Sequence, residues 1–272
     1  MPAAKYRGVF VLVLVGALAA IIFIFHWHSS AASMEEGKPT APKQPVIVEL
    51  FTSEGCSSCP PADSLLKKLS EEQPLNGIEI IALEEHVDYW NTLGWTDPFS
   101  SVDYSRRQEA YAVALPDGGV YTPQMVVDGR SQFIGNRTHE TRDQIRWAAA
   151  YPKAQLLVAA LPKTNAGARS FEVRIDPAAT VATSSSLELW VAVTEKDLSS
   201  QVAAGENSGE LLHHAPVVRL LRKQGTVAIP TRGLITFAVD INEKWNAANL
   251  SVVAFLSQPD SHQIVAAGSS SL

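Results

Sequence analysis

Cysteine is scarce in this chain, with only 2 among 272 residues. Both lie in one tetrapeptide, Cys56-Ser57-Ser58-Cys59, so none remains for a framework of structural disulfides. A zinc site built from four thiolates is excluded for the same reason. Three interpretations of the pair stay open: a redox or thiol-exchange dithiol, part of a metal site, and a vestigial or purely structural pair.

The chain also lacks an excess of basic residues. Its 22 Lys and Arg against 28 Asp and Glu give a formal net charge of −6, which argues against a nucleic-acid partner. Internal repeats and low-complexity tracts are absent as well. The composition is that of an ordinary globular protein long enough for two modest domains.

The amino terminus predicts export. Lys5 and Arg7 precede an unbroken apolar run from Val9 to Phe25, a pattern that leaves the N-terminus in the cytoplasm and sends the rest across a membrane. Residues 1–33 are therefore either a cleaved signal peptide or an uncleaved anchor. We expect a periplasmic or secreted protein, tethered to the inner membrane through residues 9–25 if the segment is retained.

An exported protein can keep a disulfide, and the segment after the leader is suited to be a linker. Disulfides persist outside the cytoplasm, so a single Cys-x-x-Cys is plausible there as a redox site. Residues 34–45 contain two glutamates and three prolines, and they predict a polar linker without a core of its own.

The surroundings of the cysteines favour the redox interpretation. The apolar segment Val46–Phe51 predicts a strand just before them, and Leu65, Leu66 and Leu69 follow at helical spacing. A Cys-x-x-Cys between a strand and a helix is typical of a redox dithiol. The helix N-terminus supplies N–H groups and a positive dipole end that stabilise a thiolate. We expect a Cys56–Cys59 redox disulfide, with no other cofactor, and Cys56 more exposed than Cys59.

Residues 46–152 predict further elements in a recognisable order. After the dithiol helix come a strand at Ile78–Leu83, a helix at Ser101–Leu115, a strand opened by Pro123, a type I′ hairpin at Asp128-Gly129 and a helix capped by Thr138. That order matches an α/β thioredoxin-like domain with a helical insertion.

Four longer motifs carry a closer resemblance: Phe51–Asp63, His86–Trp90, Gly94–Phe99 and Tyr121–Gln124. Together they resemble a family of secreted, thioredoxin-like bacterial proteins described only as a domain of unknown function. The resemblance implies that Cys56 is the nucleophile and Cys59 the resolving thiol. It also implies a cis Thr122–Pro123 bond facing them, with the Thr122 backbone pairing with substrate. It implies no established activity.

Glu49 is the one charged residue in an otherwise apolar strand. Thioredoxins place a buried Asp near this point, and Glu49 matches it if the loop gains one residue. On that basis Glu49 is a catalytic proton carrier for Cys59 with a raised pKa. The alternative, a carboxylate at a sheet edge or paired with an arginine, stays open.

Side chains near the second strand are candidates for a substrate groove. Glu54, His86, Asp88 and Trp90 are expected to line the dithiol face, where an extended peptide or a small thiol would bind. The alternative for Trp90 is packing against the insertion helix. An alternative metal site would use Cys56, Cys59 and His86 to hold Cu(I) or Zn(II).

Residues 153–272 change to short β-rich runs that predict an antiparallel β-sandwich-like domain. The expected strands are 155–161, 171–175, 187–194, 215–221, 235–241, 250–256 and 263–266. Adjacent His213 and His214 would point to opposite faces of a strand, which makes them poor joint metal ligands. We expect their hairpin to pack against the first domain.

The function predicted from these residues is an extracytoplasmic thiol–disulfide oxidoreductase acting on protein or small thiol substrates. Two alternatives belong to other classes. One is a Cu(I)- or Zn(II)-binding thioredoxin-like protein, and the other is a non-catalytic interaction module whose dithiol is a redox switch.

Overall fold

The computed structural model describes residues 43–116, 118–162, 168–176, 186–228 and 233–272, which belong to one compact unit beginning at Pro42. The expected leader, residues 1–33, and most of the expected linker lie outside the described residues. Within the described ranges, no helix is both long and apolar enough to cross a membrane.

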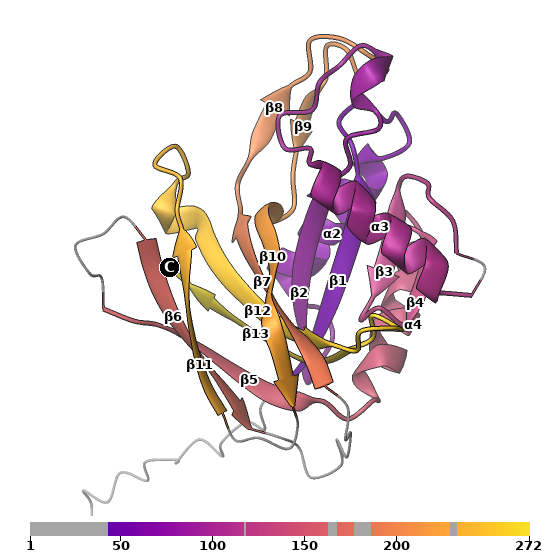
Figure 1. The fold of residues 1–272 in the computed structure, drawn as a ribbon. Helices are drawn as coiled ribbons and strands as arrows, with labels where there is room; N and C mark the ends of the chain where they lie inside the picture. The colour runs from indigo at the N-terminus through magenta and orange to yellow at the C-terminus, as the bar shows by residue number, and fades with distance from the viewer. Residues whose placement is uncertain (1–42, 117, 163–167, 177–185, 229–232) are drawn as a thin grey trace, which may run out of the picture. The chain divides into compact units, whose positions relative to one another are not determined.

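Helices and strands alternate in the first part of the described chain, and strands dominate after residue 149 (Figure 1). The elements are β1 Gln44–Thr52, α2 Pro60–Glu72, β2 Ile78–His86, η1 Asn91–Leu93, α3 Val102–Ala114, β3 Gln124–Val127, β4 Ser131–Ile134, α4 Thr138–Ala149, β5 Ala154–Ala160, β6 Ala168–Asp176, β7 Ser186–Glu195, β8 Ser199–Gln201, β9 Leu211–His213, β10 Val217–Ala228, β11 Gly233–Asp240, η2 Ala247–Asn249, β12 Leu250–Ser257 and β13 Ile264–Ser271.

The first part follows the predicted order of elements. β1 pairs in parallel with β2 and antiparallel with β3, and β3 continues into β4 through a turn in which Asp128 and Gly129 both have positive φ. β1 begins at Gln44, inside the expected linker, because Gln44 and Pro45 already pair with β2. The cap of α4 is Arg137 rather than Thr138, and Thr138 is the first helical residue.

All but two of the strands belong to one mixed sheet, in the order β11-β6-β5-β13-β12-β7-β10-β2-β1-β3-β4. β10 lies beside β2, where Val217 pairs with Glu84, so the sheet runs without a break across the expected boundary at residue 153. The predicted C-terminal strands are present, but β5 and β13 pair in parallel, so this region is not wholly antiparallel. The expected hairpin that contains His213 is present as the short pair β8–β9, which forms a separate two-stranded sheet.

Apolar packing also continues across that boundary. Ile47, Leu83 and Tyr104 from the first part share a buried cluster with Val218 and Phe255 from the second. A second cluster lies between β1 and the helices α2 and α4, and a third fills the C-terminal strands. The protein is therefore a mixed α/β structure with a large mixed sheet and few helices.

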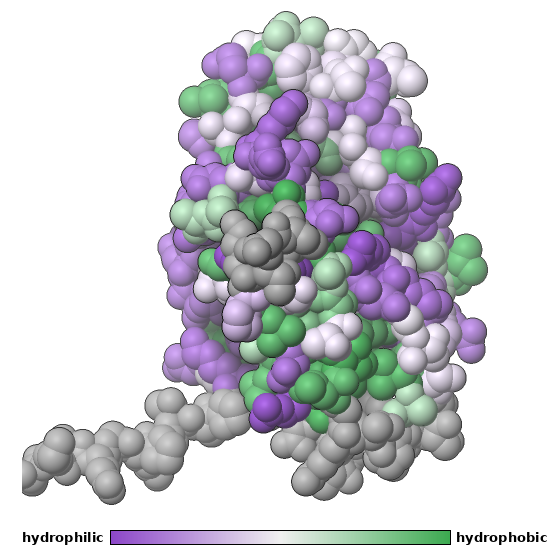
Figure 2. All heavy atoms as spheres, turned by 60° about the vertical axis from the view of Figure 1, so that its left-hand side comes forward, coloured by the Kyte–Doolittle hydropathy of each residue, from purple (hydrophilic) through white to green (hydrophobic). Residues whose placement is uncertain are grey.

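Apolar side chains are exposed near the far edge of the sheet. Figure 2 turns the side of β6 and β11 forward and shows hydrophobic side chains gathered in its lower half. Leu234 on the edge strand β11 is 58% exposed, and Leu157 on β5 is 57% exposed. Most of the sheet separates this edge from β1 and the cysteines that follow it.

Candidate functional site

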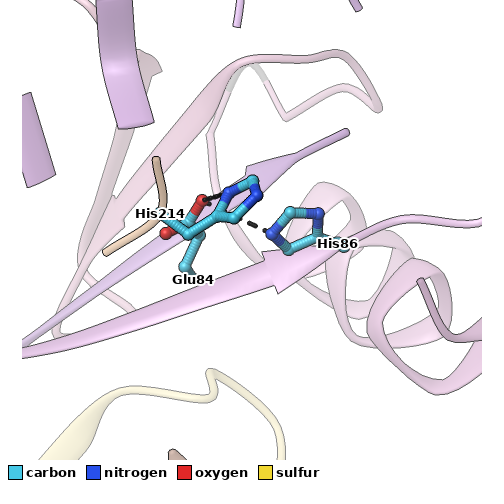
Figure 3. Close-up of side chains that lie close together, drawn as sticks. All are labelled: Glu84, His86 and His214. Atoms are coloured by element: carbon cyan, nitrogen blue, oxygen red, sulfur yellow. Dashed lines mark hydrogen bonds and ion pairs between the residues drawn. The ribbon is translucent and has the colours of Figure 1, made fainter. Parts of the chain in front are cut away.

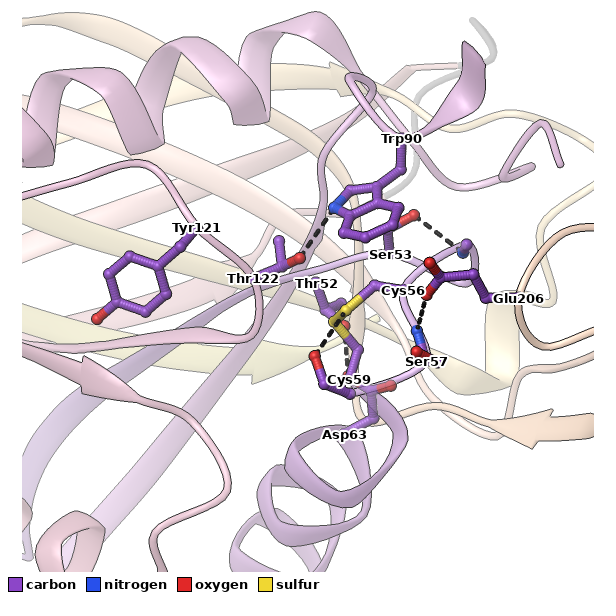
Figure 4. Close-up of a disulfide and its surroundings, with 12 residues drawn as sticks. Thr52, Ser53, Cys56, Ser57, Cys59, Asp63, Trp90, Tyr121, Thr122 and Glu206 are labelled. Carbon is purple, nitrogen blue, oxygen red and sulfur yellow. Dashed lines mark hydrogen bonds between the residues drawn. A yellow bond between two sulfur atoms is a disulfide. The ribbon is translucent and has the colours of Figure 1, made fainter. Parts of the chain in front are cut away.

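Cys56 and Cys59 form a disulfide in the turn that joins β1 to α2 (Figure 4). The turn is closed by backbone hydrogen bonds from Cys56 N to Ser53 O (3.1 Å) and from Cys59 N to Cys56 O (3.1 Å). Strand, dithiol and helix therefore follow one another as the sequence predicts.

Both cysteines are fully buried, at 0% exposure each, although Ser57 and Ser58 between them are exposed. The expectation that Cys56 is more exposed than Cys59 is wrong for this oxidised form. Because neither sulfur is exposed to solvent, a thiol or disulfide partner can reach one only if neighbouring residues move.

The amino end of α2 is poorer in hydrogen-bond donors than expected. Pro60 and Pro61 occupy its first two positions and have no N–H, while Ala62 N and Asp63 N both donate to Cys59 O, at 2.8 and 3.1 Å. The N–H groups expected to stabilise a thiolate are thus absent or occupied. The Ser58 hydroxyl, whose oxygen lies 3.4 Å from Cys56 Sγ, is a nearby donor that can take this role.

The Thr122–Pro123 peptide is cis, as the resemblance implied. Trp90 Nε1 donates to Thr122 Oγ1 at 2.9 Å, and Figure 4 shows the indole beside the disulfide. Trp90 also packs with Tyr111 and Leu115 at the insertion helix, as the alternative for this residue expected.

The loop 202–210, between β8 and β9, lies against the dithiol turn. Glu206 Oε2 accepts a hydrogen bond from Ser57 N at 3.0 Å. Asn207 Nδ2 donates to Glu54 O (2.8 Å) and Cys56 O (3.0 Å). The expected packing of this hairpin against the first part of the chain is confirmed, and its loop is held to the backbone of the dithiol turn.

A buried cluster of acids and histidines lies beside this turn. Glu84 and His86 are two residues apart on β2, so they share a face of the strand, and His214 comes from the segment after β9. Glu84 Oε1 lies 3.2 Å from His214 Nδ1 and 3.4 Å from His86 Nε2 (Figure 3). All three side chains are at most 1% exposed.

The outer ring nitrogen of each histidine faces a second carboxylate. His86 Nδ1 lies 2.7 Å from Asp97 Oδ2, and His214 Nε2 lies 3.0 Å from Glu54 Oε1. Glu54 is also held by Trp95 Nε1, which donates to its Oε2 at 2.8 Å. Glu54 and His86, predicted as groove residues, thus belong to this buried cluster.

The charges in the cluster shift one another's pKa values. Burial alone would lower the pKa of His86, but Asp97 and Glu84 raise it well above the usual value. Burial is likewise outweighed at His214, whose hydrogen bonds to Glu54 and Glu84 raise the pKa to about 9. Burial would raise the pKa of Glu84, yet the two histidines lower it. These shifts favour an ionised Glu84 carboxylate that is stabilised by the positive charge of protonated His86 and His214.

Asp63 is the buried carboxyl group of the dithiol helix. It lies one helical turn after Cys59, and its Oδ1 accepts a hydrogen bond from Thr52 Oγ1 at 2.6 Å (Figure 4). Burial, together with the negative charge of Glu84, raises the pKa of Asp63 to about 8. The sequence interpretation missed this residue.

Glu49 does not lie behind the dithiol. Val48 and Leu50 on β1 pack toward α2, so Glu49 between them points to the opposite face. There Arg107 Nε donates to its Oε1, and Tyr111 OH donates to its Oε2 at 2.5 Å. The assignment of Glu49 as proton carrier is corrected to the alternative, a buried carboxylate paired with an arginine.

Two other predicted roles also change. Asp88 Oδ1 accepts from Ser105 Oγ at 2.5 Å, and Asp88 N donates to the same hydroxyl, so the residue fastens β2 to α3 rather than lining a groove. The alternative metal set of Cys56, Cys59 and His86 is not assembled, because the two cysteines are joined in a disulfide.

The residues missed from the sequence are Asp63, Glu84, Asp97, Glu206, Asn207 and His214. A signal existed for Glu84, since the spacing Glu84-x-His86 on a strand places both on one face. His214 was set aside because its neighbour His213 points away, which the structure confirms without diminishing His214.

Comparison with known proteins gives a family and a fold. The family model described as "Protein of unknown function (DUF1223)" matches residues 47–257. The solved structure of protein AGR_C_4864 from Agrobacterium tumefaciens is similar, with 25% identity, a TM-score of 0.62, and coverage of 84% of this chain and 94% of that one. HBP35 of Porphyromonas gingivalis is similar in fold at 18% identity and a TM-score of 0.64, over 85% of this chain and 76% of that one. No curated protein matches the chain.

Proposed function

Because the chain belongs to the DUF1223 family of unknown function, we propose its activity from its own side chains: it is an extracytoplasmic thiol–disulfide oxidoreductase with a thioredoxin-like fold. The observation that carries the proposal is the Cys56–Cys59 disulfide at a strand-to-helix turn, beside the cis Thr122–Pro123 peptide and Trp90 (Figure 4). The extracytoplasmic location depends on the basic and apolar pattern of residues 5–25.

The reaction consists of two balanced thiol exchanges. In the reduced protein the Cys56 thiolate attacks a substrate disulfide, a mixed disulfide forms, and one substrate sulfur leaves as a thiolate. The Cys59 thiolate then attacks Cys56 Sγ, and the second substrate sulfur leaves. Two electrons pass to the substrate and the Cys56–Cys59 disulfide forms. A dithiol donor restores the reduced protein, and the reverse sequence oxidises a substrate dithiol.

Asp63 is suited to move the proton in the second exchange. Cys59 must lose its proton before it attacks, and the Asp63 carboxyl lies one helical turn away on the same buried side of α2. Its pKa of about 8, raised by burial and by Glu84, lets it accept or release a proton near neutral pH. His86 and His214 face it with opposing charge and hold that pKa from rising further.

The substrate is a protein or small-molecule thiol that can displace the loop 202–210. Both sulfurs are buried, and Asn207 holds the loop to the backbone of Cys56. Exposed Ser57 and Ser58 and the carboxylate of Glu206 form the outer surface that a partner meets first.

Turnover by the full-length protein tests the proposal. We expect it to catalyse reduction of a protein disulfide such as that of insulin by a dithiol, and Cys59→Ser to accumulate a mixed disulfide through Cys56. The reduction potential of the Cys56–Cys59 pair assigns the physiological direction, near about −270 mV for a reductant and about −120 mV for an oxidant. Exchange that continues unchanged in a Cys56→Ser variant refutes the proposal.

A further inference from the structure

The strongest unassigned feature of the structure is the buried cluster beside the dithiol turn. We infer that Glu84, His86 and His214 form a binding site for a divalent transition-metal ion such as Zn(II). The site fastens the segment after β9 to the end of β2.

The distances fit tetrahedral coordination. Bonds of about 2.0–2.2 Å to nitrogen and carboxylate oxygen place neighbouring ligand atoms roughly 3.3–3.5 Å apart. Glu84 Oε1 lies 3.2 Å from His214 Nδ1 and 3.4 Å from His86 Nε2. Ligand atoms of all three residues lie within 4.8 Å of one another (Figure 3).

The outer partners are those that metal-bound histidines use. A ligating imidazole donates its other N–H to a carboxylate, which fixes the ring and raises its basicity. Asp97 does this for His86 at 2.7 Å, and Glu54 does it for His214 at 3.0 Å. In the neutral tautomers that keep these protons on the outer nitrogens, the lone pairs of both rings point toward Glu84.

Protonation of the two histidines leaves more buried polar atoms without a partner than a bound metal ion would. If both rings were imidazolium ions, the charge would match the carboxylates as well as a divalent ion would. However, His86 Nε2 and Glu84 Oε2 have no hydrogen-bond partner although both are buried. A metal ion between the rings and Glu84 satisfies both atoms, because it binds the nitrogen directly and can take one or both carboxylate oxygens.

The surroundings are those of a closed site. The ring of Phe99 lies edge-on to both imidazoles, with centroids 5.4 Å from His86 and 5.2 Å from His214. The three ligand side chains are buried, so the ion is shielded from bulk water. Three side chains supply at least three ligand atoms, so the fourth tetrahedral position falls to the second Glu84 oxygen or to a water molecule.

Cobalt(II) titration of the full-length, chelator-treated protein in its oxidised form tests the inference. We expect one Co(II) per chain, with the visible bands of tetrahedral cobalt and no near-ultraviolet thiolate charge-transfer band, and displacement by Zn(II). His86→Gln, His214→Gln and Glu84→Gln should each weaken Co(II) binding by 100-fold or more. Asp97→Asn, which changes the outer partner of His86 and also an acceptor of the Glu54 and Phe99 backbone N–H groups, should weaken it by about 10–100-fold. The matched control is His213→Gln, because His213 is adjacent in sequence but exposed.

A second measurement covers variants that fail to fold. Zn(II), but not Mg(II), should raise the thermal unfolding midpoint of the wild-type protein in a concentration-dependent way. The absence of both a cobalt spectrum and a zinc-dependent midpoint overturns the inference. So does metal binding that survives in a folded His214→Gln variant. Binding that appears only after reduction, with a thiolate charge-transfer band, overturns it too and assigns the metal to Cys56 and Cys59.

Discussion

At the scale of single residues, the face of β1 on which a carboxyl group lies decides its role. Asp63 shares the α2 side of the sheet with Thr52, its hydrogen-bond partner, whereas Glu49 points to the α3 side. Of these two carboxyl groups, Asp63 is the one on the side of the dithiol helix, and we propose it as the proton carrier for Cys59.

The first prediction concerns Asp63→Asn, which keeps the size and the hydrogen-bonding capacity of the side chain but removes its proton exchange. We expect the resolving step of the full-length protein to slow by roughly 100- to 10,000-fold near neutral pH, since that is the usual contribution of a general acid or base. Stopped-flow measurement of mixed-disulfide decay between pH 6 and 9 checks it. Asp143→Asn, on the surface of α4, is the control. An unchanged pH profile would remove Asp63 from the mechanism.

The second prediction concerns Glu49→Gln, which leaves the buried Arg107 without its main counter-ion. The other acid near Arg107 Nε is Glu85, 3.7 Å away, and burial raises the pKa of Glu85 well above its usual value. We expect a loss of about 3–5 kcal/mol in unfolding free energy, as is typical when one partner of a buried pair is removed. The thiol exchange rate of the folded fraction should not change.

Urea unfolding and exchange assays on the same samples separate these two effects. The double variant Glu49→Gln/Arg107→Met removes both charges and should recover part of the lost stability. A Glu49→Gln protein that is as stable as wild type but slower in exchange would restore Glu49 as the proton carrier.

At the scale of elements, the hairpin β8–β9 lies against the dithiol turn. Its loop 202–210 covers the turn through Glu206 and Asn207, and its end carries His214 into the acid cluster. One small hairpin thus contacts both the dithiol and the candidate metal site.

The third prediction concerns Asn207→Ala, which removes two hydrogen bonds from the loop to the backbone of Glu54 and Cys56. At about 1 kcal/mol each, their loss should raise the rate of disulfide reduction by dithiothreitol roughly 10- to 30-fold. Ser208→Ala is the control, because that hydroxyl bonds within the loop to Ala203 O. Equal rates for Asn207→Ala and wild type would mean that another element limits access.

At the scale of the whole molecule, the β3–β4 turn fastens the first part of the chain to the second. Asp128 Oδ1 accepts from Ile47 N at 2.9 Å, its Oδ2 pairs with the buried ammonium of Lys153, and its backbone oxygen accepts from Ile264 N at 2.8 Å. A Cβ at Gly129 would lie 2.2 Å from His262 O, so only glycine allows this close approach.

The fourth prediction concerns the pH dependence that Asp128 gives to stability. Burial raises its folded pKa from 3.8 to about 6, although Lys153 and Arg130 oppose the shift. The folded state then holds a proton that the unfolded chain releases, so the contribution of Asp128 to stability is largest below pH 4 and is lost as pH rises toward 6.

Unfolding of wild type and Asp128→Asn by urea at pH 4 and pH 6.5 checks the sign. The stability of wild type relative to Asp128→Asn should fall between these pH values, by up to roughly 3 kcal/mol. Asn accepts the positive φ of this turn, so the backbone is kept. A difference that stays constant or grows with pH would mean that the pKa of Asp128 is not raised.

The sequence by itself determined the local features of this protein. The order of elements up to α4, the buried stripe of α2 and the positions of the C-terminal strands follow from periodicity and turn residues, which act over a few neighbouring positions. The strand-to-helix setting of Cys56 and Cys59 is local in the same sense.

Only the tertiary structure decided how distant segments meet. Strand β10 docks beside β2 and makes one sheet of two regions, and this brings His214 to Glu84 and Asn207 to Cys56, more than 100 residues away in sequence. It also turned Glu49 toward Arg107 and left Asp63 beside the dithiol. Local patterns show that a strand has two faces, but the side chains that cover each face come from elsewhere in the chain.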